Sequence, residues 1–192
     1  MADIDKLIPH IIRWETGIKP LYGESLERLF ERSRKSGYSY DTNDSGGHTQ
    51  TGITLRTFTS FRKFAGRKTP ELKDLKNISY QEWKEVLISF FWDKVHGGAI
   101  KNDSVACMIC DWYWTSGTWG LKRIQKVLKV TQDGLFGIKT LGAINKWPDG
   151  QEELWNALKK ERLAYYKKIA VGKQKKRLNG WNNRVNDMKW EE

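Results

Sequence analysis

The chain has 192 residues, which is enough for one sizeable domain or two small ones with a well-buried core. Charged residues make up 30% of it and the net charge is +11, yet apolar residues recur at regular helical spacing, which argues against disorder. No stretch approaches the ~20 apolar residues of a membrane-spanning helix, and the start, MADIDKLIPHIIRW, lacks the apolar run of a signal peptide. We therefore expect synthesis in a cytoplasm without a signal peptide, and no membrane insertion.

The positive charge is concentrated in the C-terminal part. Residues 1–119 carry 17 lysines and arginines against 15 acidic residues, whereas residues 120–192 carry 17 against 8. Such a field concentrates polyanions, so nucleic acid, anionic lipid and the bacterial cell wall are candidate partners, beside the plainer interpretation of soluble lysine-rich helices. Because no nucleic-acid recognition motif accompanies the charge, we do not expect nucleic acid as a partner. Ten tryptophans suggest additional surfaces that stack on sugars or bases.

Apolar spacing over residues 4–16 predicts a first helix, with Asp3 as its N-cap and Pro9 either bending it or marking its first turn. Gly17 is expected to end it. Glu15 then lies in the last turn, where the negative end of the helix dipole favours a protonated carboxyl group. Such a group can protonate a glycosidic oxygen, and an ordinary exposed glutamate is the alternative.

A short helix is predicted over residues 24–35, followed by a polar, glycine-rich segment over residues 37–53 that is typical of a small hairpin or loop. Thr54 is expected to cap the next helix. Ser79 and Glu82 form a capping-box pattern ahead of a further helix with regular apolar spacing.

The glycine-rich segment contains DTNDSGGHTQTGIT, in which Asp44 is a candidate second carboxyl group beside Glu15. In glycoside hydrolysis one carboxyl group donates a proton, and a second group stabilises the oxocarbenium-like charge or orients water. Thr49 or Thr51 would position that water, and Thr51 and His48 are candidates for substrate binding. For Asp44 the alternative is an Asx-turn that holds the loop.

Residues 96–104, HGGAIKNDS, are the best candidate for an internal boundary, which divides the chain into regions 1–100 and 101–192. Cys107 and Cys110 lie in an apolar helical run, so we interpret them as buried thiols and not as a redox or zinc pair. Only three histidines are present and none has metal-ligand spacing. We therefore expect neither a metal nor another cofactor.

The C-terminal half is predicted to be helical, which makes the fold class mainly α with a small hairpin. Its expected elements are a helix around 124–128, a turn at Asp133-Gly134, a short helix from Thr140 and a longer helix over 150–169. Trp114 and Trp119, in DWYWTSGTWG, are candidates for stacking on a sugar, although helical spacing places some of these tryptophans in the core.

RWETG followed by YDTNDSGGHTQTGIT resembles the N-terminal signature of the glycoside hydrolase family 108 lysozymes. That signature is Glu-Gly-Gly at the end of the first helix, then Asp-x-Gly-Gly-x-Thr-x-x-Gly-Ile-Thr. Residues 44–54 fill the second half, and Glu15-Thr16-Gly17 fills the first with threonine in place of glycine. The resemblance implies a lysozyme-like helical region and a peptidoglycan muramidase with Glu15 as catalytic acid. A more distant likeness is the Glu…Asp…Thr arrangement of phage lysozymes.

The chain differs from the family pattern between the two halves, where residues 18–36 are interpreted as an insertion. An ungapped alignment would put Lys35 at the glutamate position, and lysine cannot be the acid. Glu24, Glu27 and Glu31 lie on the inserted helix and are the spare candidates.

IQKVLKVTQDGLFGIKTLGAI, residues 124–144, resembles peptidoglycan-binding repeats, and ERLAYYKKI and NGWNNRV resemble the ending found behind family 108 catalytic regions. The resemblance implies a C-terminal helical peptidoglycan-binding-like region packed on the catalytic region. Segment 124–144 either still binds peptidoglycan or is now structural, because its turn and cap residues also have a folding role.

These resemblances imply a monomeric muramidase or endolysin that cuts peptidoglycan glycan strands at the β-1,4 bond between N-acetylmuramic acid and N-acetylglucosamine. Without a signal peptide, a holin or a dedicated export system would have to bring it to the cell wall or periplasm. The alternative is a non-catalytic cell-wall-binding or secretion-regulating protein on the same fold.

Overall fold

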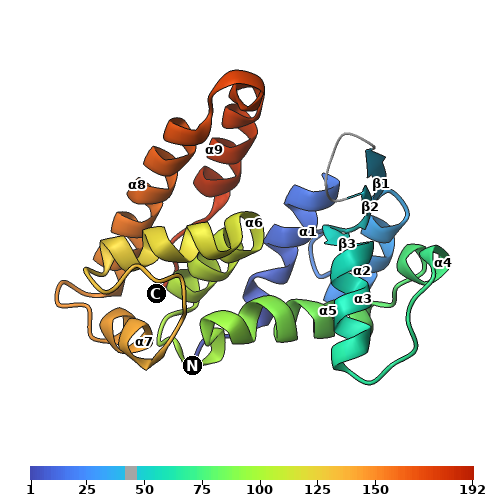
Figure 1. Cartoon of the computed structure of the whole chain (residues 1–192), viewed down its shortest axis with the longest axis horizontal. Helices are drawn as coiled ribbons and strands as arrows, with labels where there is room; N and C mark the ends of the chain where they lie inside the picture. Colours follow the sequence, from blue (N-terminus) through green and yellow to red (C-terminus); the bar gives the residue numbers. More distant parts are fainter. Residues whose placement is uncertain (42–46) are drawn as a thin grey trace. The chain divides into compact units, whose positions relative to one another are not determined.

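The fold is mainly α-helical with one small antiparallel sheet, as the sequence predicts (Figure 1). It is known from a computed structural model that describes residues 1–41 and 47–192. The chain forms two compact units: the N-terminal unit comprises residues 5–90, and the C-terminal unit comprises residues 1–4 and 91–192. The division expected between residues 100 and 101 stays a prediction. Among the helices of the described residues, none combines the length and apolar character needed to cross a membrane.

Helix α1 (Ile8–Thr16) begins later than the sequence pattern predicts. Residues Ile4–Lys6 form a separate 3-10 turn, and Leu7, not Asp3, stands at the N-cap of α1. Pro9 explains the difference, because a residue with no N–H and a fixed φ suits the first helical turn and not the interior.

Helix α2 (Leu26–Arg34) lies in the inserted segment. The hydroxyl of Ser25 caps it by accepting a hydrogen bond from Arg28 N–H at 3.3 Å. Leu29 and Phe30 are fully buried, and α2 contacts α1. The insertion is therefore an integral part of the N-terminal unit and contributes to its core.

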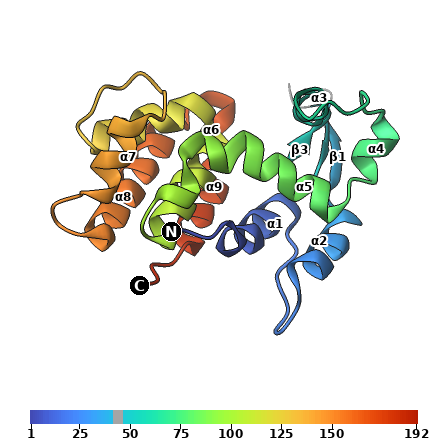
Figure 2. The ribbon, with the colours of Figure 1, turned by 90° about the horizontal axis from the view of Figure 1, so that it is seen from below.

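The sheet consists of β1 (Tyr38–Asp41), β2 (Gly47–Gln50) and β3 (Ile53–Thr54), antiparallel and in that order. Tyr40 on β1 lies opposite His48 on β2. The last two strands contact α3, and β2 also contacts α4, the short helix that follows α3 (Figure 2). The described strands of the glycine-rich segment thus pair as a small antiparallel hairpin, one of the two structures that the sequence predicts.

Three helices complete the N-terminal unit: α3 (Leu55–Phe64), α4 (Leu72–Lys76) and α5 (Tyr80–Leu87). The expected caps of α3 and α5 are present. Thr54 accepts from Thr57 N–H at 3.1 Å, and Ser79 accepts from Glu82 N–H at 3.2 Å. The Glu82 carboxylate is bound instead by Arg62, with Nε to Oε1 at 2.9 Å. After Leu87 the chain continues as a π-helical turn, Ile88–Trp92.

Trp83 of α5 is the centre of the N-terminal core. It is fully buried, its ring lies 5.2 Å from that of Phe30, and its Nε1–H donates to Thr51 O at 3.0 Å. One side chain therefore ties the sheet, α2 and α5 together, because a buried indole N–H needs an acceptor.

The C-terminal unit begins with two 3-10 turns, Asp93–Val95 and Gly97–Ala99, and continues into the long helix α6 (Asp103–Val127). Asn102 caps α6 by accepting from Val105 N–H at 3.0 Å. Gly117, at φ 51° and ψ −138°, interrupts the helix and separates residues 103–116 from residues 118–127. That conformation is open to glycine and strained for other residues, so the kink is encoded locally.

The rest of the C-terminal unit consists of α7 (Ile138–Asn145), α8 (Gln151–Ile169), a 3-10 segment (Gly172–Arg177) and α9 (Leu178–Asp187). Helices α8 and α9 lie side by side as a helical hairpin, and α8 packs along α6 (Figures 1 and 2). Helix α7 starts two residues earlier than predicted, so Thr140 lies inside its first turn and not at its cap.

A buried ionic cluster joins α6, α8 and α9. Asp111 is fully buried and accepts from Arg162 Nη2 at 2.6 Å and from Arg184 Nη2 at 2.7 Å. Arg162 is itself fully buried, and its Nε donates to the hydroxyl of Tyr166 at 3.1 Å. Two guanidinium groups thus share one carboxylate in the core of the unit.

Cys107 and Cys110 are buried free thiols on α6, which confirms the sequence interpretation. Burial raises the pKa of the Cys107 thiol to about 12 and that of Cys110 well above its usual value. Because the thiolate is the nucleophile and the metal ligand, the pair is unsuited to redox or zinc chemistry at neutral pH.

Candidate active site

Glu15 occupies the last turn of α1 and is half-buried. Gly17 ends the helix there as expected, with φ at 76° and its N–H donating to Arg13 O at 2.8 Å. The Thr16 hydroxyl donates to Ile12 O at 2.7 Å, so it satisfies one of the carbonyls at the helix end. The carboxyl group is therefore held on a rigid helix terminus in the negative field of the dipole.

Two of the three spare acids are held by arginines, and one of these, Glu24, lies just before α2 and not on it as the sequence predicts. Glu24 accepts from Arg32 Nε at 2.7 Å and Nη2 at 2.8 Å, and from Leu21 N–H at 3.1 Å. These hydrogen bonds, those from Arg32 first, lower the pKa of Glu24 to about 2. Glu31 accepts from Arg34 Nη2 at 2.6 Å. A carboxyl group with so low a pKa is deprotonated at neutral pH, so Glu24 is unsuited to proton donation.

Thr49 and His48 are neighbours on β2, so their side chains point to opposite faces of the sheet. Thr49 is half-buried and lies opposite Ser39 on β1 and Thr54 on β3, which gives one face a row of hydroxyl groups. Asp44, the expected second carboxyl group, lies outside the described residues. Of the residues expected to position water, the structure therefore describes Thr49 and its row of hydroxyl groups but not Asp44.

The opposite face of the hairpin is aromatic. The ring of His48 stacks on Tyr40 with centroids 4.2 Å apart, and its Nδ1 lies 2.7 Å from the hydroxyl of Tyr38. Tyr40 is 57% exposed, and Lys76 Nζ lies 4.5 Å from the centre of the Tyr38 ring. Sequence reasoning selected His48 but missed the two tyrosines, although their period-two spacing is the signal that they share a face.

Thr51 has a structural role. It is fully buried, at φ 44°, and its hydroxyl lies 3.4 Å from Gln50 Oε1. Its N–H donates to Gly37 O at 2.9 Å, and its carbonyl accepts from Trp83. The hydroxyl has no exposed surface with which to reach a glycan, so Thr51 fixes the turn between β2 and β3.

Trp114 and Trp119 belong to the C-terminal unit. Trp114 is half-buried, with its ring 4.4 Å from that of Phe91. Trp119 is 66% exposed, and Lys122 Nζ lies 5.3 Å from its ring centre. Of the two, Trp119 retains the larger accessible ring surface for stacking on a sugar.

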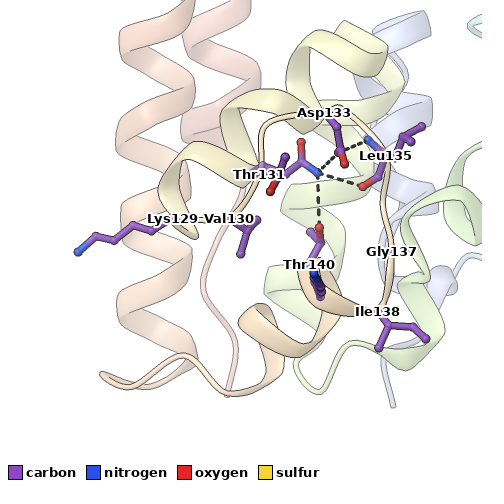
Figure 3. Close-up of a pocket in the computed structure, with 10 residues that line it drawn as sticks. Lys129, Val130, Thr131, Asp133, Leu135, Gly137, Ile138 and Thr140 are labelled. Atoms are coloured by element: carbon purple, nitrogen blue, oxygen red, sulfur yellow. Dashed lines mark hydrogen bonds between the residues drawn. The ribbon is translucent and has the colours of Figure 1, made fainter.

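Segment 124–144 folds around Gln125, which is almost completely buried. Its side-chain NH2 donates to Asp133 Oδ1 at 2.7 Å and to Leu135 O at 3.0 Å (Figure 3). Its side-chain oxygen accepts from Gly134 N–H at 2.8 Å. Hydrogen bonds from Leu135 N–H and then Gln125 lower the pKa of Asp133. The polar residues of this segment therefore hold the loop together, and a pocket of about 550 Å³ lined by Thr140 lies beside them.

Two family models match adjoining parts of the chain. Residues 32–117 match the model described as Glycosyl hydrolase 108, and residues 119–186 match the model described as Predicted Peptidoglycan domain. The junction coincides with the kink at Gly117. The first match begins after Glu15 and includes the whole hairpin. The chain thus carries a match to the family 108 glycosyl hydrolases followed by a match to a peptidoglycan domain, and the pair supports a peptidoglycan hydrolase of the glycoside hydrolase class.

Among solved structures, SagA from Brucella abortus is similar over nearly the whole chain. The two are 28% identical with a TM-score of 0.69, and the match covers 95% of this chain and 89% of that one. None of the curated proteins matches.

Proposed function

We propose that the protein is a muramidase that hydrolyses the β-1,4 bond between N-acetylmuramic acid and N-acetylglucosamine, with Glu15 as general acid. The observation that carries the proposal is the placement of Glu15: half-buried, in the last turn of α1, closed by a left-handed glycine. It belongs to the same compact unit as the hairpin of the family 108 match.

The proposed chemistry uses one proton and one water molecule. Glu15 donates its proton to the glycosidic oxygen as the bond to the leaving sugar breaks. Asp44 serves as the second carboxyl group, and the hydroxyl of Thr49 helps to orient the attacking water. Tyr40 and His48 offer a stacked aromatic surface for a neighbouring sugar.

The site of action in this proposal is the cell wall. The surplus of cations in residues 120–192 supports retention on an anionic polymer, since such a field raises its local concentration. Delivery by a holin or an export system belongs to the same proposal.

One observation favours a second function, a non-catalytic wall-binding or secretion-regulating protein. The family 108 match begins at residue 32, so it does not include Glu15. In an ungapped alignment Lys35 takes the position of the family's glutamate, and Lys35 is exposed at the end of α2. If Lys35 occupies the position of the family's glutamate, the site contains no acid at that position.

Catalytic turnover separates the two functions. Purified peptidoglycan carrying a covalent dye is incubated with a small molar amount of the full chain, and the soluble dye is measured over time. A muramidase releases soluble fragments in large molar excess over protein, with a rate proportional to protein concentration. Saturable binding to the pellet without release of soluble dye would establish the non-catalytic function instead.

A further inference from the structure

The pocket in the C-terminal unit is formed by one short stretch of chain, from the end of α6 to the first turn of α7. Its inner wall is the group of residues hydrogen-bonded to the Gln125 side chain, which we call the hub (Figure 3). The amide of Gln125 makes its hydrogen bonds within this group. The outer wall is different. Leu135 is 71% exposed and Ile138 is 87% exposed, and both line the pocket. A rigid polar base thus presents aliphatic side chains to an open space.

Leu135 and Ile138 give the rim of the pocket an aliphatic surface. A concave site lined by apolar side chains with a few polar groups suits a ligand that has apolar groups of its own. The backbone of Leu135 is fixed at both ends, because its N–H donates to Asp133 Oδ1 at 2.8 Å and its C=O accepts from Gln125. The side chain is therefore held outward by the hub.

The charge of the pocket favours an anionic ligand. Lys129 and Lys139 are two of its lining residues, against one carboxylate, Asp133, whose Oδ1 accepts from Gln125 and from Leu135 N–H, so the lining keeps an excess of positive charge. The backbone of Lys129 adopts φ 56°, a left-handed conformation that is unfavourable for residues other than glycine. Its side chain extends away from the pocket (Figure 3). Cations therefore flank an aliphatic surface.

The lining also argues for a peptide and against a sugar ring. None of the ten described residues that line the pocket is aromatic, whereas flat aromatic surfaces are the usual partners of sugar faces. Leucine, isoleucine and valine suit small aliphatic side chains, and lysine suits a carboxylate.

We propose that this pocket binds the short peptide that peptidoglycan carries on its glycan strands, with aliphatic side chains against Leu135 and Ile138 and a carboxylate facing Lys139. The inference rests on peptidoglycan being the substrate of the proposed function. Beyond that function, it specifies that the C-terminal unit binds the peptide part of the polymer, in the pocket between α6 and α7.

The test is titration of the full-length wild-type chain with a synthetic N-acetylated peptide, Ala–γGlu–Lys–Ala–Ala, followed by calorimetry. The pocket variant carries Ile138→Ser and Lys139→Gln. The matched control carries Val171→Ser and Lys173→Gln, the same loss of charge and of apolar surface at exposed positions of the same unit outside the pocket. All four substituted side chains are exposed and peripheral to the core, so each variant should melt like the wild type.

We expect the pocket variant to bind the peptide roughly tenfold more weakly or worse, and the control to bind like the wild type. Peptide-free glycan strands should bind all three chains equally. Equal peptide affinity in both variants, no peptide binding by the wild type, or a selective loss of glycan affinity in the pocket variant would each overturn the proposal. If the wild type releases dye but does not bind the peptide, only the peptide-binding proposal is wrong. If it binds the peptide but releases no dye, only the proposed hydrolase activity is wrong.

Discussion

Glu15→Gln is expected to lower the rate of peptidoglycan hydrolysis by roughly 10²–10⁴-fold, because glutamine has the same shape but no proton to donate to the glycosidic oxygen. Binding to peptidoglycan should be unchanged, since the substitution leaves the rest of the surface intact. Glu15 is half-buried at a helix end, so the free energy of unfolding should change by less than about 1 kcal/mol. The initial rate of dye release, a pelleting assay and a thermal melt measure these three quantities.

The matched control is Glu27→Gln, the same chemical change on an exposed face of α2. It should hydrolyse peptidoglycan at the wild-type rate. Full activity in Glu15→Gln would remove Glu15 from the acid role. Activity lost in Glu27→Gln and kept in Glu15→Gln would move the proton donor to the inserted helix.

Asp111→Asn is expected to destabilise the protein by about 3–5 kcal/mol, the largest stability effect that we anticipate for a single polar substitution. The amide removes the one carboxylate that Arg162 and Arg184 share, and it leaves two buried guanidinium groups facing a neutral side chain. Their attraction for Asp111 is lost and their mutual repulsion is no longer screened by its charge, in a part of the core that joins α6, α8 and α9. Equilibrium unfolding in urea gives the change directly, and the melting temperature should fall on the order of 10 °C.

Asp149→Asn provides the comparison, because Asp149 is exposed in the turn before α8. Its effect should stay within about 0.5 kcal/mol of the wild type. An Asp111→Asn variant as stable as Asp149→Asn would mean that the two arginines do not depend on Asp111, and the cluster would lose its assigned role in holding the three helices together.

Local signals predicted much of the fold. Thr54 and Ser79 cap the helices that the sequence assigned to them, and Gly17 ends α1, because capping depends on only a few adjacent residues. The hairpin was one of two structures that the polar, glycine-rich segment predicted, and its residue pattern alone did not separate a hairpin from a loop. Asp3 was the wrong N-cap because apolar spacing alone does not show that Pro9 belongs to the first turn.

Features that depend on distant residues could not be predicted. Asp111, Arg162 and Arg184 meet only in the folded chain, so spacing does not reveal that they form one cluster. Thr51 looked like its neighbour Thr49, and only the packing of Trp83 beneath the turn separates a buried structural threonine from a half-buried one. The role of Glu15 as acid and the pairing with Asp44 remain predictions, because a family signature fixes residue types and not distances.

The most direct measurement of the central claim is the identity of the new reducing ends that the enzyme creates in purified peptidoglycan. After digestion the product is reduced with borohydride and hydrolysed, and the resulting sugar alcohols are separated. A bond broken after N-acetylmuramic acid yields muramitol, in an amount that grows with time for the wild type and stays at background for Glu15→Gln. Glucosaminitol, or no sugar alcohol above background from the wild-type digest, would contradict the account.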